Sequence, residues 1–223
     1  MKDEKLKSFK YWKTHELQEH FGIQKIKKSK ELADWLAVSS EVTPAEKAEL
    51  DKLQEPLIEM VQYWNEATLQ YYFITPFLRM IDFRSDKYQA FLEAKLSFVH
   101  NNQTIQGKID FLVASGEFAP KTPFFALHEY KPEPHISTEP QGQLLVAMMA
   151  AAQENEKKGI DLPLYGTYIM GRLFFFVYFY KNQFATSLAY DSTRSDLYSI
   201  FNILKKAKGY IDNAVGRMEG LTV

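Results

Sequence analysis

The sequence predicts an α/β protein in which helices flank a central mixed β-sheet. Residues 107–112 and 124–131 are apolar segments bounded by turn residues, which is typical of neighbouring strands. Residues 173–180 are apolar on both faces, as in a central strand that is covered on both sides. Residues 141–157 follow a helix-start pattern and carry apolar side chains at helical spacing, so helices and strands alternate along the chain.

The chain before the sheet is predicted to be helical. Residues 30–37 are typical of a short helix, and Thr43 with Pro44 forms a helix start in which Thr is the N-cap and Pro the first helical residue. We therefore expect a helical extension over residues 1–55 and a larger domain over residues 56–223.

The larger domain divides into helical and extended segments. A first helix is indicated by apolar side chains that recur with a period of 3.6 residues. The pair Asn101-Asn102 predicts a hairpin turn. The expected elements are a helix over 57–72, strands over 91–100, 107–114 and 124–131, a helix over 141–157, strands over 164–170, 173–180 and 183–190, and a helix over 196–214.

The composition limits the class of protein. The 223 residues include no Cys, so disulfides and thiolate zinc sites are excluded and a reducing, cytoplasmic compartment is expected. The N-terminal stretch is rich in Lys and Glu without an apolar core, so no signal peptide is expected. The longest apolar runs are too short to span a bilayer, so no membrane partner is expected.

The net charge of −1 weakens any nucleic-acid interpretation that is based on overall charge. Local groups of lysines can still attract a polyanion. Two such groups are present, and their ordinary interpretations are a solvated linker and a helix C-terminus. The groups are Lys25, Lys27, Lys28 and Lys30, and Lys205, Lys206 and Lys208.

The two apolar segments at the centre of the chain contain charged residues. Asp110 lies in the first segment, and Glu129 and Lys131 lie near the end of the second. Because side chains alternate across a strand, Glu129 and Lys131 point to the same face. Carboxylates on an apolar sheet are costly unless they pair or bind something. Two interpretations remain open: a structural ion-pair cluster, or a site for Mg²⁺, which needs few protein ligands because it keeps several waters.

The motif Gly107-x-x-Asp110, followed on the next strand by Glu129-x-Lys131, resembles the core of the PD-(D/E)XK nuclease superfamily. The resemblance extends over flanking elements, from about residue 56 to residue 210. It implies a restriction-endonuclease-like fold, with a three-layer core around a mixed sheet. It also implies that Asp110 and Glu129 ligate Mg²⁺, for which Mn²⁺ substitutes, and that Lys131 orients the attacking water and stabilises charge.

The resemblance implies two further metal ligands. The backbone carbonyl of Tyr130 is one of them. Asn65-Glu66-x-Thr68 resembles a helix that supplies a carboxylate to the metal site in restriction-type members, so Glu66 is implied as an outer or second-metal ligand. The ordinary alternative for Glu66 is a solvated residue on a helix.

The helix after the second segment contains an accessory candidate. The superfamily often places a Gln one turn into this helix, where it orients the scissile phosphate or a water at the metal. Gln143 fits this position, and Gln141 is the competitor. Ala147 occupies the position where a Tyr sometimes follows, which leaves the role of Gln143 open. A polar residue in the first turn of a helix is the ordinary interpretation.

Two functions therefore remain open. The first is a Mg²⁺-dependent nuclease that hydrolyses phosphodiester bonds of DNA, with DNA as partner and a homodimer or a partner subunit as further options. Its catalytic residues are Asp110, Glu129, Lys131, Glu66 and Gln143. The second is a non-catalytic nucleic-acid-binding or assembly protein on a nuclease-like scaffold, including a subunit of a restriction or defence system. His135, in a Pro-rich loop, is a further candidate for ligand contact.

Overall fold

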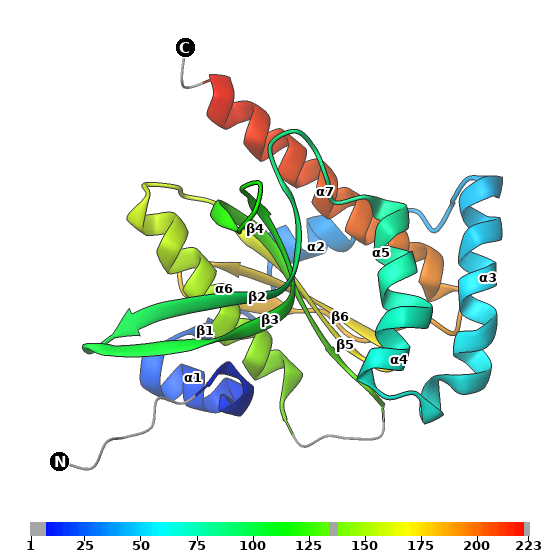
Figure 1. Ribbon diagram of the computed structural model, residues 1–223, viewed down its shortest axis with the longest axis horizontal. Helices are drawn as coiled ribbons and strands as arrows, with labels where there is room; N and C mark the ends of the chain where they lie inside the picture. Colours follow the sequence, from blue (N-terminus) through cyan, green and yellow to red (C-terminus); the bar gives the residue numbers. More distant parts are fainter. Residues whose placement is uncertain (1–7, 134–137, 221–223) are drawn as a thin grey trace.

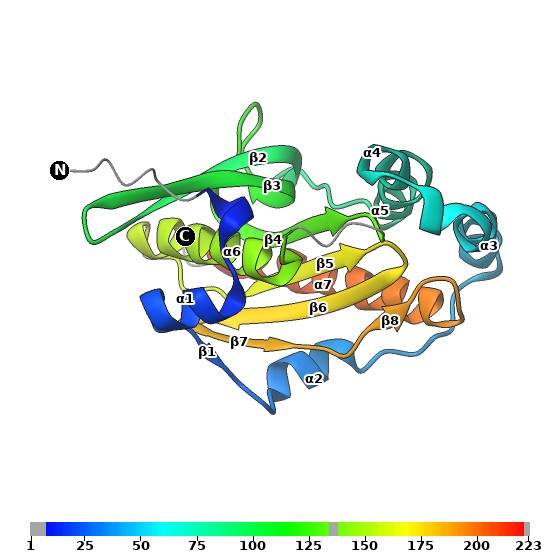
Figure 2. The same ribbon diagram turned by 90° about the horizontal axis from the view of Figure 1, so that it is seen from below.

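A computed structural model describes residues 8–133 and 138–220 of the chain. Within these residues, eight strands form one mixed sheet, and helices pack on both of its faces (Figures 1 and 2). This arrangement confirms the predicted α/β class with a central mixed sheet. In the same two ranges, no helix is both long enough and apolar enough to cross a membrane.

The elements follow one another along the chain as helices first, then mainly strands. The helical elements are η1 (Phe9–Tyr11), α1 (Thr14–Phe21), α2 (Lys30–Leu36), α3 (Pro44–Met60), η2 (Val61–Tyr63), α4 (Glu66–Leu69), η3 (Gln70–Ile74), α5 (Thr75–Ile81), α6 (Pro140–Lys157) and α7 (Asp196–Gly220). The strands are β1 (Gln24–Lys25), β2 (Gln89–His100), β3 (Gln103–Ser115), β4 (Lys121–Lys131), β5 (Leu164–Met170), β6 (Leu173–Tyr180), β7 (Gln183–Thr186) and β8 (Tyr190–Asp191).

The strand order across the sheet is β1-β7-β6-β5-β4-β3-β2, and β8 pairs with β6 as well. The β1–β7 and β4–β5 pairs are parallel. The other pairs are antiparallel, including β5, β6 and β7, which form the expected meander. Strand β4 therefore lies near the middle of the sheet, between an antiparallel and a parallel neighbour.

The predicted hairpin is confirmed and is unusually long. Asn101 and Asn102 form its turn with φ values of 49° and 61°, in the left-handed region that Asn tolerates better than most residues. In Figure 1 the hairpin of β2 and β3 extends across α6. Gln153 of α6 fixes it there, because its side chain exchanges two hydrogen bonds, of 3.1 and 3.2 Å, with the backbone of Val99.

Two hydrophobic cores cover the two faces of the sheet. Helices α2, α3, α5 and α7 bury one face, and α6 buries the other together with η1 and α1. The side chains of β6 alternate between the two cores: Phe174 and Phe176 lie in the first, and Val177 and Phe179 in the second. The prediction that this strand is covered on both sides is confirmed.

The N-terminal elements contribute to both cores. Phe9 and Leu17 are buried in the core of α6, and Trp35 and Leu50 in the core of α7. The indole N–H of Trp35 donates a hydrogen bond of 2.8 Å to the carbonyl of Ile203, which joins α2 to α7. The division of the chain at residue 55 stays a prediction.

The helix predicted over residues 57–72 is wrong in its middle. Helix α3 ends, the chain turns through η2, and a new helix begins at Glu66. Asn65 caps this helix, since its Oδ1 accepts a hydrogen bond of 2.8 Å from the N–H of Thr68. Such a side-chain cap competes with a continuous helix. Tyr72, the last residue of the predicted helix and part of its apolar spacing, is 53% exposed.

Two other predicted boundaries are also wrong. The strand expected over residues 183–190 is divided into β7 and β8, which pair with opposite ends of β6. The last helix, expected over residues 196–214, continues to Gly220. The first change is a break inside the expected strand, and the second lies at the end of a helix, where assignments of a boundary commonly vary.

Candidate active site

Four charged side chains from three parts of the chain meet at the C-terminal end of β4. The Nζ atom of Lys131 lies 2.7 Å from Oε1 of Glu129 and 3.3 Å from Oε2 of Glu66. Oδ2 of Asp110 accepts a hydrogen bond of 2.7 Å from the N–H of Tyr130. The structure thus brings together four of the five predicted catalytic residues, together with the backbone of Tyr130.

The local separation of two strands explains how Asp110 reaches β4. The pairing of β3 with β4 reaches only as far as Phe111 and His128, so the next residues of β4 no longer pair with β3. The carboxylate of Asp110 takes the place of a main-chain acceptor for the N–H of Tyr130. The separation of the strands therefore makes room for side chains where a regular sheet would hold backbone hydrogen bonds.

The carbonyl of Tyr130 faces the same gap. The N–H and C=O groups of one strand residue point toward the same neighbouring strand. The carbonyl of Lys131 accepts a hydrogen bond of 2.8 Å from Gly171, at the end of β5. One residue earlier, the N–H of Tyr130 points toward Asp110, so its carbonyl faces that side too. The carboxylate of Asp110 and this carbonyl are therefore on one side of β4.

Glu129 is fully buried, and the ammonium of Lys131 is its one close polar partner among the described residues. Its Oε1 lies 2.7 Å from Nζ of Lys131, and apart from this ion pair neither carboxylate oxygen has a hydrogen-bond partner within the described residues. Burial, together with the charge of Asp110, raises the pKa of Glu129 to about 8. Burial also raises the pKa of Asp110 to about 6, although Lys131 and the N–H of Tyr130 act in the opposite direction.

The charge of Lys131 is held in place by the acids around it. Burial opposes the charged form of Lys131, but Glu129, Asp110 and Glu66 outweigh burial and raise the pKa of the ammonium group. When all four groups are ionised, three carboxylates and one ammonium leave a net charge of −2. A divalent cation would balance this charge.

The donors at this site fit a hard cation that takes oxygen ligands. Two carboxylates and a backbone carbonyl leave positions for waters, which Mg²⁺ retains readily. Oε2 of buried Glu129, which has no hydrogen-bond partner among the described residues, is free to serve as a ligand. In the part of the chain that the structure describes, no three His, Asp or Glu side chains form a metal-ligand set by themselves. A metal here would therefore depend on the carbonyl of Tyr130 and on waters as well.

The predicted Gln residues of α6 make no hydrogen bond to the charged cluster within the described residues, so the role of Gln143 stays a prediction. Gln143 is 8% exposed and makes no hydrogen bond with the four charged residues among those described. Gln141 has a role within the fold, because it donates to Oγ1 of Thr186 at 3.2 Å and accepts from the hydroxyl of Tyr168 at 3.4 Å. Ala147 is fully buried, and as an alanine it offers no polar group at the position where the resemblance sometimes places a Tyr.

Glu93 is a neighbour of the site that sequence reasoning missed. It lies opposite Asp110 in the hairpin, has a φ of 47° and forms an ion pair of 2.7 Å with Lys108. Such a φ is rare for a residue other than Gly in the middle of a strand. The signal was present: a two-residue turn at Asn101 and Asn102 fixes the register that places Glu93 opposite Asp110.

Other polar groups lie outside the candidate site. His128 Nδ1, the Tyr130 hydroxyl and Thr167 Oγ1 are buried and have no hydrogen-bond partner among the described residues. Burial lowers the pKa of His128 to about 3, so this side chain is neutral. It packs against Phe111 on the face of the sheet that α7 covers. His135 lies outside the described residues.

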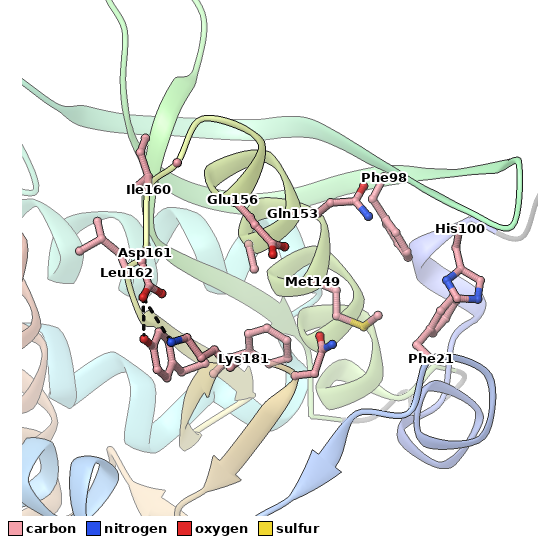
Figure 3. A pocket seen from close by; sticks show the side chains of 15 residues that line it. Phe21, Phe98, His100, Met149, Gln153, Glu156, Ile160, Asp161, Leu162 and Lys181 are labelled. Carbon is pink, nitrogen blue, oxygen red and sulfur yellow. Dashed lines mark hydrogen bonds and ion pairs between the residues drawn. The ribbon is translucent and has the colours of Figure 1, made fainter.

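Two cavities differ in their relation to the site. One, of about 620 Å³, adjoins Asp110 and Tyr130 and is bordered by Arg79 and Arg84. The other, also of about 620 Å³, is shown in Figure 3 and lies beside the C-terminal half of α6. Its residues include none of those predicted for catalysis. Of these two cavities, the first is the one that borders the charged cluster.

A scan of protein-family models finds no match to the chain, and a search of curated proteins finds none either. The geometry of the charged cluster is therefore the basis for a proposal of function.

Proposed function

We propose that the protein is a Mg²⁺-dependent nuclease that hydrolyses phosphodiester bonds of DNA, built on a restriction-endonuclease-like fold. One observation carries the proposal: Asp110, Glu129, Glu66 and Lys131 converge at the end of β4 with more negative than positive charge, and the buried carboxylate of Glu129 has no hydrogen-bond donor apart from Lys131 among the described residues. A DNA substrate and a chain without Cys both suit the reducing cytoplasm.

The acids and a carbonyl would hold the metal. Asp110, Glu129 and the backbone carbonyl of Tyr130 are the proposed Mg²⁺ ligands, and Glu66, which is 41% exposed at its side chain, is the outer one. When bound, Mg²⁺ withdraws charge from the scissile phosphate and stabilises the charge that develops during hydrolysis. Without a cation, the same carboxylates would take up protons near neutral pH, as their raised pKa values indicate.

Lys131 and the nearby arginines would act on the reacting groups and the substrate. The side chain of Lys131 is 17% exposed, so its ammonium can donate hydrogen bonds to the attacking water and to a phosphate oxygen in a partly dry environment. The cavity beside Asp110 provides space for the substrate, and Arg79 and Arg84 at its border can bind neighbouring phosphates.

A plasmid-cleavage assay tests the proposal. Wild-type protein with Mg²⁺ or Mn²⁺ is expected to cut the plasmid, whereas Asp110→Ala and Lys131→Ala should each lose activity by a factor of about 100 or more. Asp161→Ala and Lys181→Ala remove a lysine–carboxylate pair of the same chemistry from the cavity in Figure 3, and they should cut like wild type. Site variants that cut as fast as wild type would contradict the assignment.

A non-catalytic nucleic-acid-binding or assembly protein on this scaffold is the second candidate, including a subunit of a restriction or defence system. Ala147 and the near-neutral net charge favour it, as does the ion pairing of Lys131 with two carboxylates. Calorimetric titration with Mg²⁺ or Mn²⁺ separates the two candidates. Saturable heat that Asp110→Ala abolishes supports the nuclease, and a titration without heat supports the scaffold.

A further inference from the structure

A groove of about 560 Å³ lies where the N-terminal segment, the β2–β3 hairpin and the start of α6 meet. Its charged residues are Lys10, Lys95 and Lys108, and its lining includes no Asp or Glu. The hydroxyls of Ser8 and Ser97 add hydrogen-bond donors. In a chain with a net charge of −1, the groove is therefore a local concentration of positive charge.

The position of Lys10 is fixed by two glycines. Its neighbour Phe9 is 1% exposed and packs on β3 at Gly107, where a Cβ atom would lie 2.3 Å from Cγ of Phe9. Two residues after Lys10, the carbonyl oxygen of Trp12 lies 2.3 Å from the position that a Cβ atom of Gly142 would occupy. Only Gly permits such close approach at either end. The segment that carries Lys10 is therefore held firmly between β3 and α6.

Two of the three lysines are available to a ligand. Lys10 and Lys95 contact no acidic side chain within residues 8–133 and 138–220, whereas Lys108 pairs with Glu93 at 2.7 Å. Glu93 is itself 73% exposed at its side chain, so its pairing with Lys108 is weak. An anion in the groove would meet three ammonium groups and little competition from carboxylates.

Gln143 provides a second, independent indication of a ligand. The side chain lines the groove and is 8% exposed, yet its Oε1 is buried without a hydrogen-bond donor among the described residues. A buried amide oxygen without a donor is costly unless a ligand or a water supplies one. DNA carries such donors, since the amino groups of adenine, cytosine and guanine are presented on the base edges in its grooves.

The groove leads to the charged cluster. Lys108 and Asp110 are two residues apart in β3, which corresponds to roughly 7 Å along a strand. Glu93, which pairs with Lys108, also lies opposite Asp110. A polymer bound in the groove would therefore extend toward Asp110 and Glu129.

We propose that this groove binds the DNA strand next to the scissile phosphate. Lys10, Lys95 and Lys108 contact phosphates, and Gln143 contacts the edge of a base. The N-terminal segment is thus part of the substrate site. The position of the bound strand next to the scissile phosphate rests on the proposed nuclease function. Binding of DNA in the groove does not require cleavage.

Fluorescence anisotropy with a short labelled DNA duplex in EDTA tests the proposal, with the full chain and without cleavage. The triple variant of Lys10, Lys95 and Lys108 to Ala is compared with a triple variant of equal charge, Lys25, Lys27 and Lys28 to Ala, which lies near the opposite edge of the sheet. The groove variant should weaken binding by about 10-fold or more and reduce the slope of log Kd against log salt by up to about 0.9 for each lost contact. The control variant should stay within about twofold of wild type.

Gln143→Leu is the second variant, because it keeps the volume of the side chain and removes the amide. We expect binding to weaken by about threefold, with the salt slope unchanged, since the lost contact carries no charge. Circular dichroism of each variant verifies that the fold is intact.

The outcomes separate the groove from the nuclease. Equal losses of DNA affinity in the two triple variants, or no DNA binding by the wild type, would overturn the proposal that the groove binds DNA. If DNA binding depends on the three lysines but the protein cleaves no DNA, the proposal of DNA binding in the groove is supported and the nuclease function is refuted. If the protein cleaves DNA but the three lysines do not affect DNA binding, the nuclease function is retained and the proposal of DNA binding in the groove is refuted.

Discussion

Two lysine–carboxylate pairs in this protein have the same chemical groups and opposite surroundings. Glu129 and Lys131, at the end of β4, lie 2.7 Å apart with side chains that are 0% and 17% exposed. Asp161 and Lys181, in the cavity of Figure 3, lie 3.3 Å apart and are 65% and 66% exposed. Water screens the second pair, so it contributes little to stability. The first is desolvated, and the charges around it do not balance.

Hydrogen bonding widens the difference between the pairs. Asp161 also accepts a hydrogen bond of 3.0 Å from the hydroxyl of Tyr180, and solvent reaches both of its partners. In the described part of the chain, Glu129 has no hydrogen-bond donor apart from Lys131. Water solvates the charges of the exposed pair, so that pair needs no further partner. The charges around the buried pair do not balance, so a proton or a cation is needed there. This contrast distinguishes a candidate site from an ordinary surface interaction.

The largest effect is expected when the ammonium is removed from the buried pair. Lys131→Met should lower the free energy of unfolding by about 2–4 kcal/mol at pH 8, because it leaves the carboxylate of Glu129 buried without compensation. Lys181→Met should change it by less than about 0.5 kcal/mol. Urea denaturation measures both. Similar losses in the two variants would show that burial does not distinguish the pairs.

The next effect is a pH dependence that arises from Glu129. Its pKa is about 8 in the folded protein against an ordinary 4.5, so the folded state binds the extra proton between these values. Stability in EDTA should therefore fall as pH rises from about 4.5 to 8, and Glu129→Gln should remove about 1–3 kcal/mol of this fall. Asp110, with a pKa of about 6, adds a fall in the same direction at lower pH.

Thermal unfolding across this pH range tests the contribution of Glu129. Asp161→Asn, in the exposed pair, is the matched control and should follow the wild-type curve. A Glu129→Gln curve with the same slope as wild type would mean that Glu129 carries no extra proton in the folded state.

A smaller effect is expected from metal binding. Mg²⁺ at about ten times its dissociation constant should stabilise the wild type by about 1.4 kcal/mol, which raises Tm by about 3 °C. The rise should be larger at pH 8 than at pH 6, because ionised carboxylates bind the metal. Asp110→Asn should abolish the rise and Asp161→Asn should keep it. A rise that survives in Asp110→Asn would place the metal elsewhere.

Glu66 lies between the two extremes, and its effect on stability should be the smallest. Its side chain is 41% exposed and lies 3.3 Å from Lys131, so Glu66→Gln should change the free energy of unfolding by less than about 0.5 kcal/mol. Cleavage should fall by about 10-fold, since an outer ligand positions the metal. Differential scanning fluorimetry and the plasmid assay measure the two effects. Unchanged cleavage would remove Glu66 from the site.

Local patterns sufficed for most of the fold. The alternation of β6 between two cores and the hairpin turn at Asn101 and Asn102 both follow from backbone geometry over a few residues, and both were predicted correctly. The helix over residues 57–72 was not, because its apolar spacing continues through the position where Asn65 caps a new helix. A cap and a periodic pattern compete there, and the spacing alone does not show which prevails.

The candidate site was predictable in part. Asp110, Glu129 and Lys131 were singled out because burying charged residues on apolar strands costs free energy unless they pair or bind a ligand. Their meeting with Glu66 was expected from a resemblance, and the contact itself depends on where α4 begins. The role of Gln143 as an accessory residue stays a prediction, and its place in a basic groove depends on the packing of η1.

The sequence by itself determined the mixed α/β class, the order of the strands along the chain, and the presence of two acids and a lysine on successive strands. Tertiary structure alone decided that β3 and β4 separate beyond Phe111, that buried Glu129 has no donor apart from Lys131 among the described residues, and that the packing of Phe9 on β3 places Lys10 beside the hairpin. The physical reason is the range of the interactions. Strand and helix periods arise from neighbouring residues, whereas burial and unbalanced charge arise where segments far apart in the chain exclude water together.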